Sequence, residues 1–264
     1  MKDTVTQWVI TGVSRGLGAA LVDAFLHHTA CHIVGVARTT PECIPNYETW
    51  LATERYQYLQ LDIASSQCCE VLSALAQGLS AEPLGVILNA AHVEQDIAEN
   101  HAIKYEVFHQ VNQVGITGMG YVLAAFESHL LAYGGMVVGI SSLWGKVPPL
   151  FLPWLAYPAS KAYLNMAFRC LRVTWRNRVN VVMVHIGNIE DTTRTSLPKW
   201  LVPKYSMAAG KIVRTLMKAK VRKSMYYPLW HALVYCAILR FIPESVYAWI
   251  FQIYFKLEAL QGKQ

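Results

Sequence analysis

The chain has 264 residues, of which 54% are hydrophobic and 15% are charged. This length is sufficient for one large domain with a buried core, and the composition excludes a disordered protein. The net charge of +6 arises from one segment, because ten Lys or Arg and no Asp or Glu occur between Thr192 and Pro243. This concentration of charge predicts an anionic partner for that segment, and we expect no nucleic-acid partner.

In chain order, the sequence alternates strand and helix patterns. Strands are predicted at residues 7–11, 31–37, 56–61, 84–89, 135–142 and 179–185, and helices at residues 17–28, 65–77, 104–131 and 155–176. Alternation at this spacing indicates βαβ units. We therefore predict an α/β fold, a Rossmann-like, doubly wound parallel sheet with helices on both faces. We expect a single domain with its core at about residues 6–193.

Residues 194–264 are predicted to form a substrate lid and an apolar, basic C-terminal extension. A basic helix is predicted at residues 208–223, followed by an aromatic stretch at residues 225–255. The longest uncharged run there has 15 residues, fewer than the roughly 18 of a spanning helix, so we predict no transmembrane helix. The segment from 192 to 255 could make peripheral contact with an anionic membrane, receive an acidic carrier or a coenzyme A phosphate, or pack on its own core or a second subunit.

The six cysteines include no C-x-x-C pair and no cluster with His at the spacing of a zinc site. We therefore expect reduced thiols in a cytoplasmic protein and no bound metal.

A glycine-rich turn, TGVSRGLG, joins the first strand to the first helix at residues 11–18. Gly12 permits a tight turn, Gly16 allows the backbone to approach a pyrophosphate, and Gly18 allows the helix to pack closely. The N–H groups at the start of the helix can then hold phosphates. This pattern predicts a dinucleotide site that also includes Ser14 and Leu17.

The end of the second strand distinguishes NAD from NADP, because an acid there binds the ribose hydroxyls and repels a 2′-phosphate. Here the strand ends in Ala37-Arg38 without an acid, and Arg15 lies in the glycine turn. Two guanidinium groups suit a phosphate dianion, so NADP(H) is the predicted cofactor. Asp62 could accept from the adenine amino group, and Asn89 could instead brace the neighbouring strand ends.

Tyr157 and Lys161 lie four residues apart in YPASK and therefore on one face of a helix. An ammonium beside a phenol lowers a pKa that starts near 10, as general acid/base catalysis at neutral pH requires. Ser141 and Ser142 end the preceding strand and bring a hydroxyl to the same edge of the sheet.

These residues resemble the short-chain dehydrogenase/reductase family over about residues 6–193. The matching motifs are TGVSRGLG (11–18), LNAA (88–91), VNQVG (111–115), ISS (140–142) and YPASK (157–161). The resemblance implies that Tyr157 gives a proton to the substrate oxygen and that Ser142 hydrogen-bonds the carbonyl. It also implies that Lys161 holds the nicotinamide ribose and lowers the Tyr157 pKa, and that Asn112 anchors a water relay.

The catalytic set is thus Asn112, Ser142, Tyr157 and Lys161, and the predicted substrate contacts are Ser142, Trp144 and Tyr157. The predicted cofactor contacts are Gly12, Ser14, Arg15, Gly16, Leu17, Gly18, Arg38, Asp62, Ile63, Asn89, Ala90, Tyr157, Lys161, Ile189 and Thr192.

The chain departs from the family pattern at two of its motifs. Leu88 and Ala91 stand where the family usually has Asn and Gly. After the sixth strand Ile189 is kept, so a backbone contact to the carboxamide is expected. Asp191 takes the place of the usual Thr, which leaves the cofactor contact to the neighbouring Thr192.

An aromatic lining around the site predicts an apolar, aromatic or lipid-like substrate, although these residues could instead pack the extension. The residues concerned are Trp144, Leu150, Phe151, Trp154, Leu197, Trp200, Leu201, Met207, Tyr226, Trp230 and Tyr235. We predict an NADP(H)-dependent carbonyl reductase that reduces a ketone or aldehyde, or oxidises the alcohol. The alternatives are an inactive cofactor-binding scaffold, or an epimerase or dehydratase on the same fold. The resemblance implies a homodimer or homotetramer through the helices at residues 104–131 and 155–176.

Overall fold

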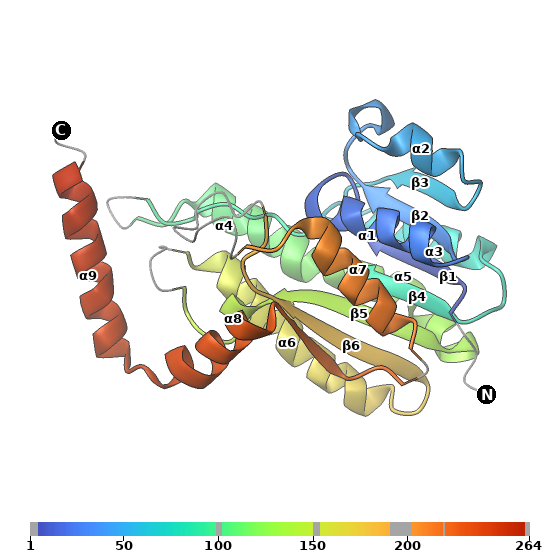
Figure 1. Cartoon of the computed structure of the whole chain (residues 1–264). Coiled ribbons are helices and arrows are strands. Elements are labelled where there is room, and N and C mark those ends of the chain that lie inside the picture. The colour runs from blue at the N-terminus through green and yellow to red at the C-terminus, as the bar shows by residue number, and fades with distance from the viewer. Residues whose placement is uncertain (1–4, 99–101, 150–153, 191–201, 219, 262–264) are drawn as a thin grey trace.

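The computed structural model describes residues 5–98, 102–149, 154–190, 202–218 and 220–261, and its centre is a seven-stranded sheet (Figure 1). The strands are β1 (Gln7–Thr11), β2 (His32–Ala37), β3 (Tyr56–Gln60), β4 (Leu84–Leu88), β5 (Gly135–Ser142), β6 (Val179–Ile186) and β7 (Ser224–Tyr227). Their order is β3-β2-β1-β4-β5-β6-β7, and every pair is parallel. The predicted doubly wound parallel sheet is confirmed.

Side chains alternate between the two faces of the sheet and form two hydrophobic cores. Trp8 and Ile10 of β1 belong to one core and Val9 to the other. The helices α1 (Gly16–His28), α2 (Tyr47–Leu51) and α7 (Tyr205–Leu216) contribute to the first core, and α3 (Cys68–Gly78), α5 (Met119–Tyr133) and α6 (Ala156–Thr174) to the second. Helices therefore cover both faces, as the alternating sequence pattern requires.

The long helix predicted at residues 104–131 runs from Tyr105 to Tyr133. It consists of α4 (Tyr105–Asn112), a π-helical segment η2 (Gln113–Gly118) and α5. Within the described chain this helix is long and apolar enough to cross a membrane, but α5 packs on α3 and β4 and carries side chains of the second core. Part of its apolar composition therefore serves the second core.

The C-terminal part differs from the sequence prediction. The basic helix expected at residues 208–223 is α7, which ends at Leu216. Beyond it, Lys218, Lys220 and Arg222 place like charges at short intervals, which disfavours further helix. The aromatic stretch was not predicted to contain a strand, yet β7 pairs with β6. Pro228 follows β7 and cannot donate to a continued ladder.

After β7 the chain forms a helical extension. Its elements are α8 (Leu229–Leu233), the π-helical segment η5 (Val234–Ile238), the 3-10 turn η6 (Leu239–Phe241) and α9 (Glu244–Gln261). Two parts of it, Leu229–Phe241 and Glu244–Ile250, are apolar enough for a membrane span only when taken together, and they meet at a bend of 111°. Figure 1 shows α9 projecting away from the sheet at the side opposite to α2 and β3.

Candidate active site

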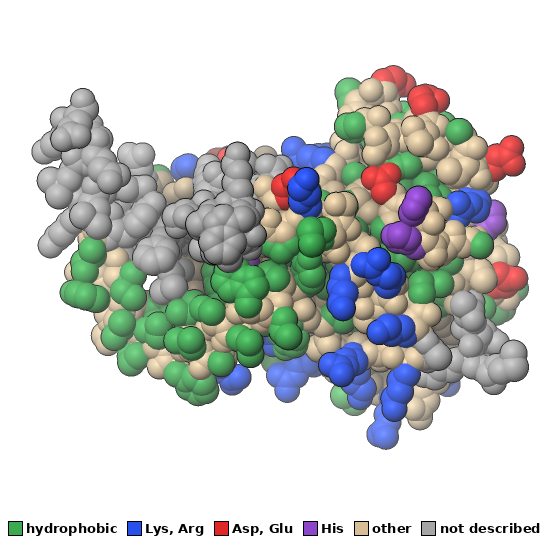
Figure 2. Space-filling view, viewed as in Figure 1, with side chains coloured by type: hydrophobic (Ala, Val, Ile, Leu, Met, Phe, Trp, Pro, Cys, Tyr) green, Lys and Arg blue, Asp and Glu red, His purple; other side chains and the backbone are tan. Residues whose placement is uncertain are grey.

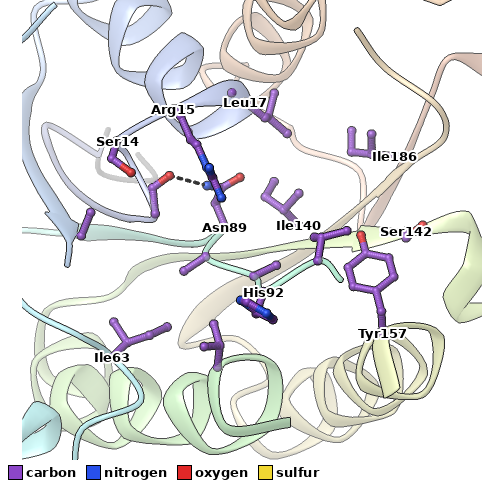
Figure 3. Close-up of a pocket in the computed structure, with 18 of the residues that line it drawn as sticks. Ser14, Arg15, Leu17, Ile63, Asn89, His92, Ile140, Ser142, Tyr157 and Ile186 are labelled. Atoms are coloured by element: carbon purple, nitrogen blue, oxygen red, sulfur yellow. Dashed lines mark hydrogen bonds between the residues drawn. The ribbon is translucent and has the colours of Figure 1, made fainter. Parts of the chain in front are cut away.

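A cleft of about 870 Å³ lies at the carboxyl ends of the strands, where the order of the sheet reverses between β1 and β4. This is the position at which open α/β sheets bind ligands. Figure 3 shows its walls, with Arg15 and Leu17 at the start of α1, Ile63 after β3, and Tyr157 on α6. Residues that are far apart in the sequence therefore face one space.

The glycine turn has the geometry expected from its sequence. Gly12 has φ +73° and Gly16 has φ +58°, a region that favours glycine. A Cβ on Gly18 would collide with the Gly12 carbonyl oxygen and would lie 2.7 Å from the Asn89 amide nitrogen. Helix α1 thus begins directly against the turn, and its first N–H groups face a cradle into which a pyrophosphate fits.

Thr11 and Asn89 join the ends of β1 and β4. The Asn89 amide donates to the Thr11 oxygen at 3.0 Å and to the Gly12 oxygen at 3.1 Å. Figure 3 draws one of these two bonds. The Thr11 hydroxyl accepts from the N–H groups of Asn89 and Ala90, each at 3.1 Å. The bracing role considered for Asn89 is therefore confirmed, and this network holds the glycine turn in position.

Two arginines line the end of the cleft beside the glycine turn without an acidic partner. Arg15 and Arg38 are both exposed, and neither forms an ion pair within the described part of the chain. Asp62 uses one carboxylate oxygen to accept from the N–H of Ala64 at 2.9 Å, which fixes the turn after β3. Two uncompensated guanidinium groups suit a phosphate monoester at this end.

The three residues Ser142, Tyr157 and Lys161 meet at the other end of the cleft. The side chains of Ser142 and Tyr157 lie close together on the wall of the cleft (Figure 3). The Lys161 ammonium donates to the Ile140 oxygen at 2.9 Å and lies 5.5 Å from the centre of the Tyr157 ring. The motif therefore brings a hydroxyl, a phenol and an amine to one place.

Burial governs the protonation of this group. It raises the pKa of Tyr157 to about 12, against a lowering by the Ser142 hydrogen bond, and lowers the pKa of Lys161 to about 8. The prediction that Lys161 lowers the pKa of Tyr157 is therefore wrong for this structure, because burial raises that pKa. At neutral pH the phenol is protonated, which is the form that donates a proton to a carbonyl oxygen.

The structure also distinguishes the two serines at the end of β5. The hydroxyl of Ser141 is buried and donates to the Asn165 side chain at 2.8 Å. Ser142 accepts from the N–H of Trp144 at 3.2 Å and faces Tyr157. The Ser141 hydroxyl is therefore engaged within the protein, and Ser142 is the candidate substrate contact.

A buried carboxylate positions the helix that carries Tyr157 and Lys161. Asp96, which has no exposed surface, accepts from the N–H of Leu155 at 2.9 Å and from that of Ala156 at 2.7 Å. These are orphan donors at the start of α6, where a negative charge is also favoured by the helix dipole. The loop after β4 therefore caps α6.

Most of the predicted site residues line this one cleft. These are Gly12, Ser14, Arg15, Gly16, Leu17, Gly18, Arg38, Asp62, Ile63, Asn89, Ala90, Ser142, Trp144, Tyr157, Lys161 and Ile189. Asn112 is not part of the lining; it ends α4, immediately before the π-helical segment. Thr192 lies outside the described residues. The water relay through Asn112 and the Thr192 contact remain predictions.

Aromatic rings form one wall beside the candidate catalytic residues. Trp144, Trp154 and Tyr157 contact each other edge to face, with ring centres 5.5 to 6.1 Å apart. Other members of the predicted lining lie elsewhere: Tyr226 stacks on His185, and Met207 is 59% exposed. Leu150, Phe151, Leu197, Trp200 and Leu201 lie outside the described residues.

Sequence reasoning missed Tyr205 and His231. The Tyr205 ring lines the cleft 3.4 Å from where a Cβ on Gly16 would lie, and it contributes to the raised pKa of Tyr157. His231 is buried, and its Nδ1 accepts from the N–H of Asn188 at 3.1 Å. No local motif marks either residue, because each reaches the site from an element distant in sequence.

Comparisons with known proteins agree with this arrangement. Among solved structures, the chain is similar to a short-chain dehydrogenase from Streptomyces avermitilis, with 20% identity and a TM-score of 0.75 over 98% of this chain and 99% of that chain. It is also similar to a short chain dehydrogenase from Burkholderia cenocepacia J2315 in complex with NADP, with 21% identity and a TM-score of 0.72 over 92% of this chain and 100% of that chain. At these identities the structures show a shared fold. A family model described as short chain dehydrogenase matches residues 7–201, well over half of the sequence, and the chain therefore belongs to the short-chain dehydrogenase family.

Proposed function

We propose that this protein is an NADP(H)-dependent carbonyl reductase, which reduces a ketone or aldehyde or oxidises the corresponding alcohol. One observation carries the proposal: Ser142, Tyr157 and the buried amine of Lys161 line the same cleft as the glycine turn, with that amine 5.5 Å from the centre of the Tyr157 ring. A proton donor, an oxyanion donor and a dinucleotide cradle at one site suit hydride transfer to a carbonyl.

In this proposal the protein orients the reactants and moves a proton, and the bound cofactor supplies the hydride. The hydroxyls of Ser142 and Tyr157 hold the carbonyl oxygen, and the Tyr157 phenol gives its proton to that oxygen as the alcohol forms. Lys161 holds the nicotinamide ribose and supports the phenolate that results. Asn112 anchors the water relay that returns a proton.

Preference for NADP(H) is supported by Arg15 and Arg38, which are free of acidic partners within the described chain. The similar Burkholderia cenocepacia structure holds NADP. Replacing Ala37 with Asp and Arg38 with Gln would place a carboxylate where the 2′-phosphate is expected. The variant should shift preference towards NADH, measured as the ratio of kcat/KM for the two cofactors. A native enzyme that prefers NADH would contradict the charge argument.

The proposed substrate is apolar, aromatic or lipid-like. The rings of Trp144 and Trp154 supply an apolar surface against Tyr157.

We also propose a cytoplasmic homodimer or homotetramer, organised as one domain with its core at about residues 6–193. The six cysteines are free thiols. Exposed apolar side chains on α6, namely Tyr163, Met166 and Val173, support a subunit contact through this helix.

The test is oxidation of NADPH, followed at 340 nm, with a panel of aromatic diketones and long-chain ketones. Tyr157→Phe should lower turnover by roughly 100-fold or more and leave NADPH binding intact, because only the proton-donating oxygen is lost. Tyr163→Phe, an exposed tyrosine on the same helix, is the matched control. Activity of Tyr157→Phe within about tenfold of the native protein would exclude this tyrosine as the acid. Lys161→Ala should impair both turnover and NADPH binding.

A further inference from the structure

We propose that the outer face of the C-terminal extension, at residues 229–250, docks onto the headgroup region of an anionic lipid bilayer. The proposal concerns a surface outside the cleft and does not depend on the catalytic assignment. Two adjoining surfaces carry it. We call them the apolar face and the cationic flank.

The apolar face consists of large side chains that project from α8, η5, η6 and α9 into solvent. Its members are between 39% and 76% exposed: Leu229, Leu233, Ile238, Phe241, Val246 and Trp249. Figure 2 shows hydrophobic side chains gathered over this part of the molecule, at the lower left. Soluble proteins rarely leave an apolar patch of this extent uncovered, so the face has an apolar occupant.

The cationic flank lies beside it on α7 and the loop that leads to β7. Its exposed members are Lys211, Arg214, Lys218, Lys220, Arg222 and Lys223. Figure 2 shows Lys and Arg side chains over this region on the same side of the molecule as the apolar face. No Asp or Glu occurs between residues 192 and 243 to neutralise them. Apolar side chains beside a cluster of cations match the acyl boundary and the phosphates of an anionic bilayer.

The shape of the extension suits a position on the membrane plane and not across it. The segment Leu229–Phe241 is about 20 Å long as a helix, and the bilayer core is about 30 Å thick. The chain then turns by 111° into Glu244–Ile250, and Arg240 and Glu244 flank the turn. Two short apolar arms joined at a charged turn can both lie in the interface.

A second copy of the chain fits this surface less well. In a two-fold contact the same patches of the two subunits face each other. The cationic flank of one copy would then meet residues 192–243 of the other copy, which contain no Asp or Glu. The apolar side chains on α6 supply a separate surface for subunit contact. The apolar face is thus left for a partner that combines hydrocarbon with negative charge.

The extension is also tied to the active site. His231 in α8 accepts from the N–H of Asn188, a residue of the cleft wall, at 3.1 Å. A bilayer on the apolar face would therefore lie one helix away from the cleft. This arrangement would let a lipid-like substrate reach the cleft from the membrane surface.

Sedimentation of the full-length protein with vesicles tests the proposal. The protein should bind vesicles of phosphatidylcholine with about 30% phosphatidylglycerol and should not bind phosphatidylcholine alone, and binding should weaken as salt rises from about 50 to 500 mM. Lys218→Glu/Lys220→Glu should reduce the partition coefficient by about tenfold or more. Lys104→Glu/Arg169→Glu makes the same charge change on other elements and should not.

The apolar face is tested by Phe241→Ser, which should reduce binding at least as strongly as the charge reversal. Tyr133→Ser, at the end of α5, replaces another exposed aromatic side chain and is its control. Circular dichroism confirms that each variant is folded. A native protein that stays in the supernatant with anionic vesicles at low salt overturns the proposal. Equal binding of the native protein to neutral vesicles overturns it too. So does a native dimer that binds no vesicles and dissociates in Phe241→Ser, because the apolar face would then be a subunit interface.

Discussion

The buried amine of Lys161 should make the stability of the protein depend on pH in a characteristic way. The ordinary pKa of lysine is 10.5, and burial lowers the pKa of Lys161 to about 8. Between these values the unfolded chain binds more protons than the folded one, so the free energy of unfolding rises with pH. The difference of about 2.5 between the two pKa values corresponds to a gain of roughly 3 kcal/mol in the free energy of unfolding. The gain is absent below pH 8 and complete above pH 10.5.

The measurement is urea unfolding of the native protein and Lys161→Met at several pH values from 7 to 10.5. Methionine keeps the length of the side chain but does not titrate, so the difference between the two curves isolates Lys161. The Met variant also loses the hydrogen bond to the Ile140 oxygen, which shifts the difference by a constant. Lys211→Met, at an exposed lysine, is the matched control. A difference that stays flat within about 0.5 kcal/mol across this range would refute the reasoning.

Three further predictions follow from single contacts. Asp96→Ala should destabilise the protein by about 2 kcal/mol or more in thermal or urea unfolding and should lower kcat, because two N–H groups at the start of α6 lose their acceptor. An unchanged unfolding midpoint would show that the cap is dispensable. His231→Leu should weaken NADPH binding several-fold, as measured by titration, because the Asn188 N–H loses its acceptor. An unchanged affinity would show that α8 does not influence cofactor binding. Gly18→Ala should abolish NADPH binding or folding, because its Cβ would collide with the Gly12 oxygen, and a stable, active variant would contradict the close packing of α1.

The sequence predicted the sheet well where a strand pattern is bounded by turn residues, including β3, which contains no β-branched residue. Six strands lie within one residue of their expected ends. The seventh, β7, was missed because its residues merge with a longer apolar stretch, and only pairing with β6 identifies them as a strand. The basic helix was predicted too long, since cationic residues are good helix formers singly but repel each other in a row.

The site was predictable to the extent that its residues form local motifs. The glycine turn and the Tyr157–Lys161 pair are each readable within a few positions, and the topology of the sheet brings them together. Asp96 reaches α6 across about sixty residues of chain, and His231 reaches Asn188 across 43, so no local pattern reveals them. The raised pKa of Tyr157 could not be predicted either, because it is caused chiefly by burial and burial depends on the packed structure.

The cap at Asp96 has a consequence for how the protein loses activity. The start of α6 is capped by the loop after β4, and the same helix carries Tyr157 and Lys161. If this loop opens, the first turn of α6 loses its acceptors while the sheet remains paired. We therefore expect the end of the cleft with Tyr157 and Lys161 to open as a separate cooperative unit, at a lower free energy than global unfolding. Mild heat or denaturant should abolish activity before the sheet melts, and the amides of Leu155 and Ala156 should exchange with solvent at the lower energy.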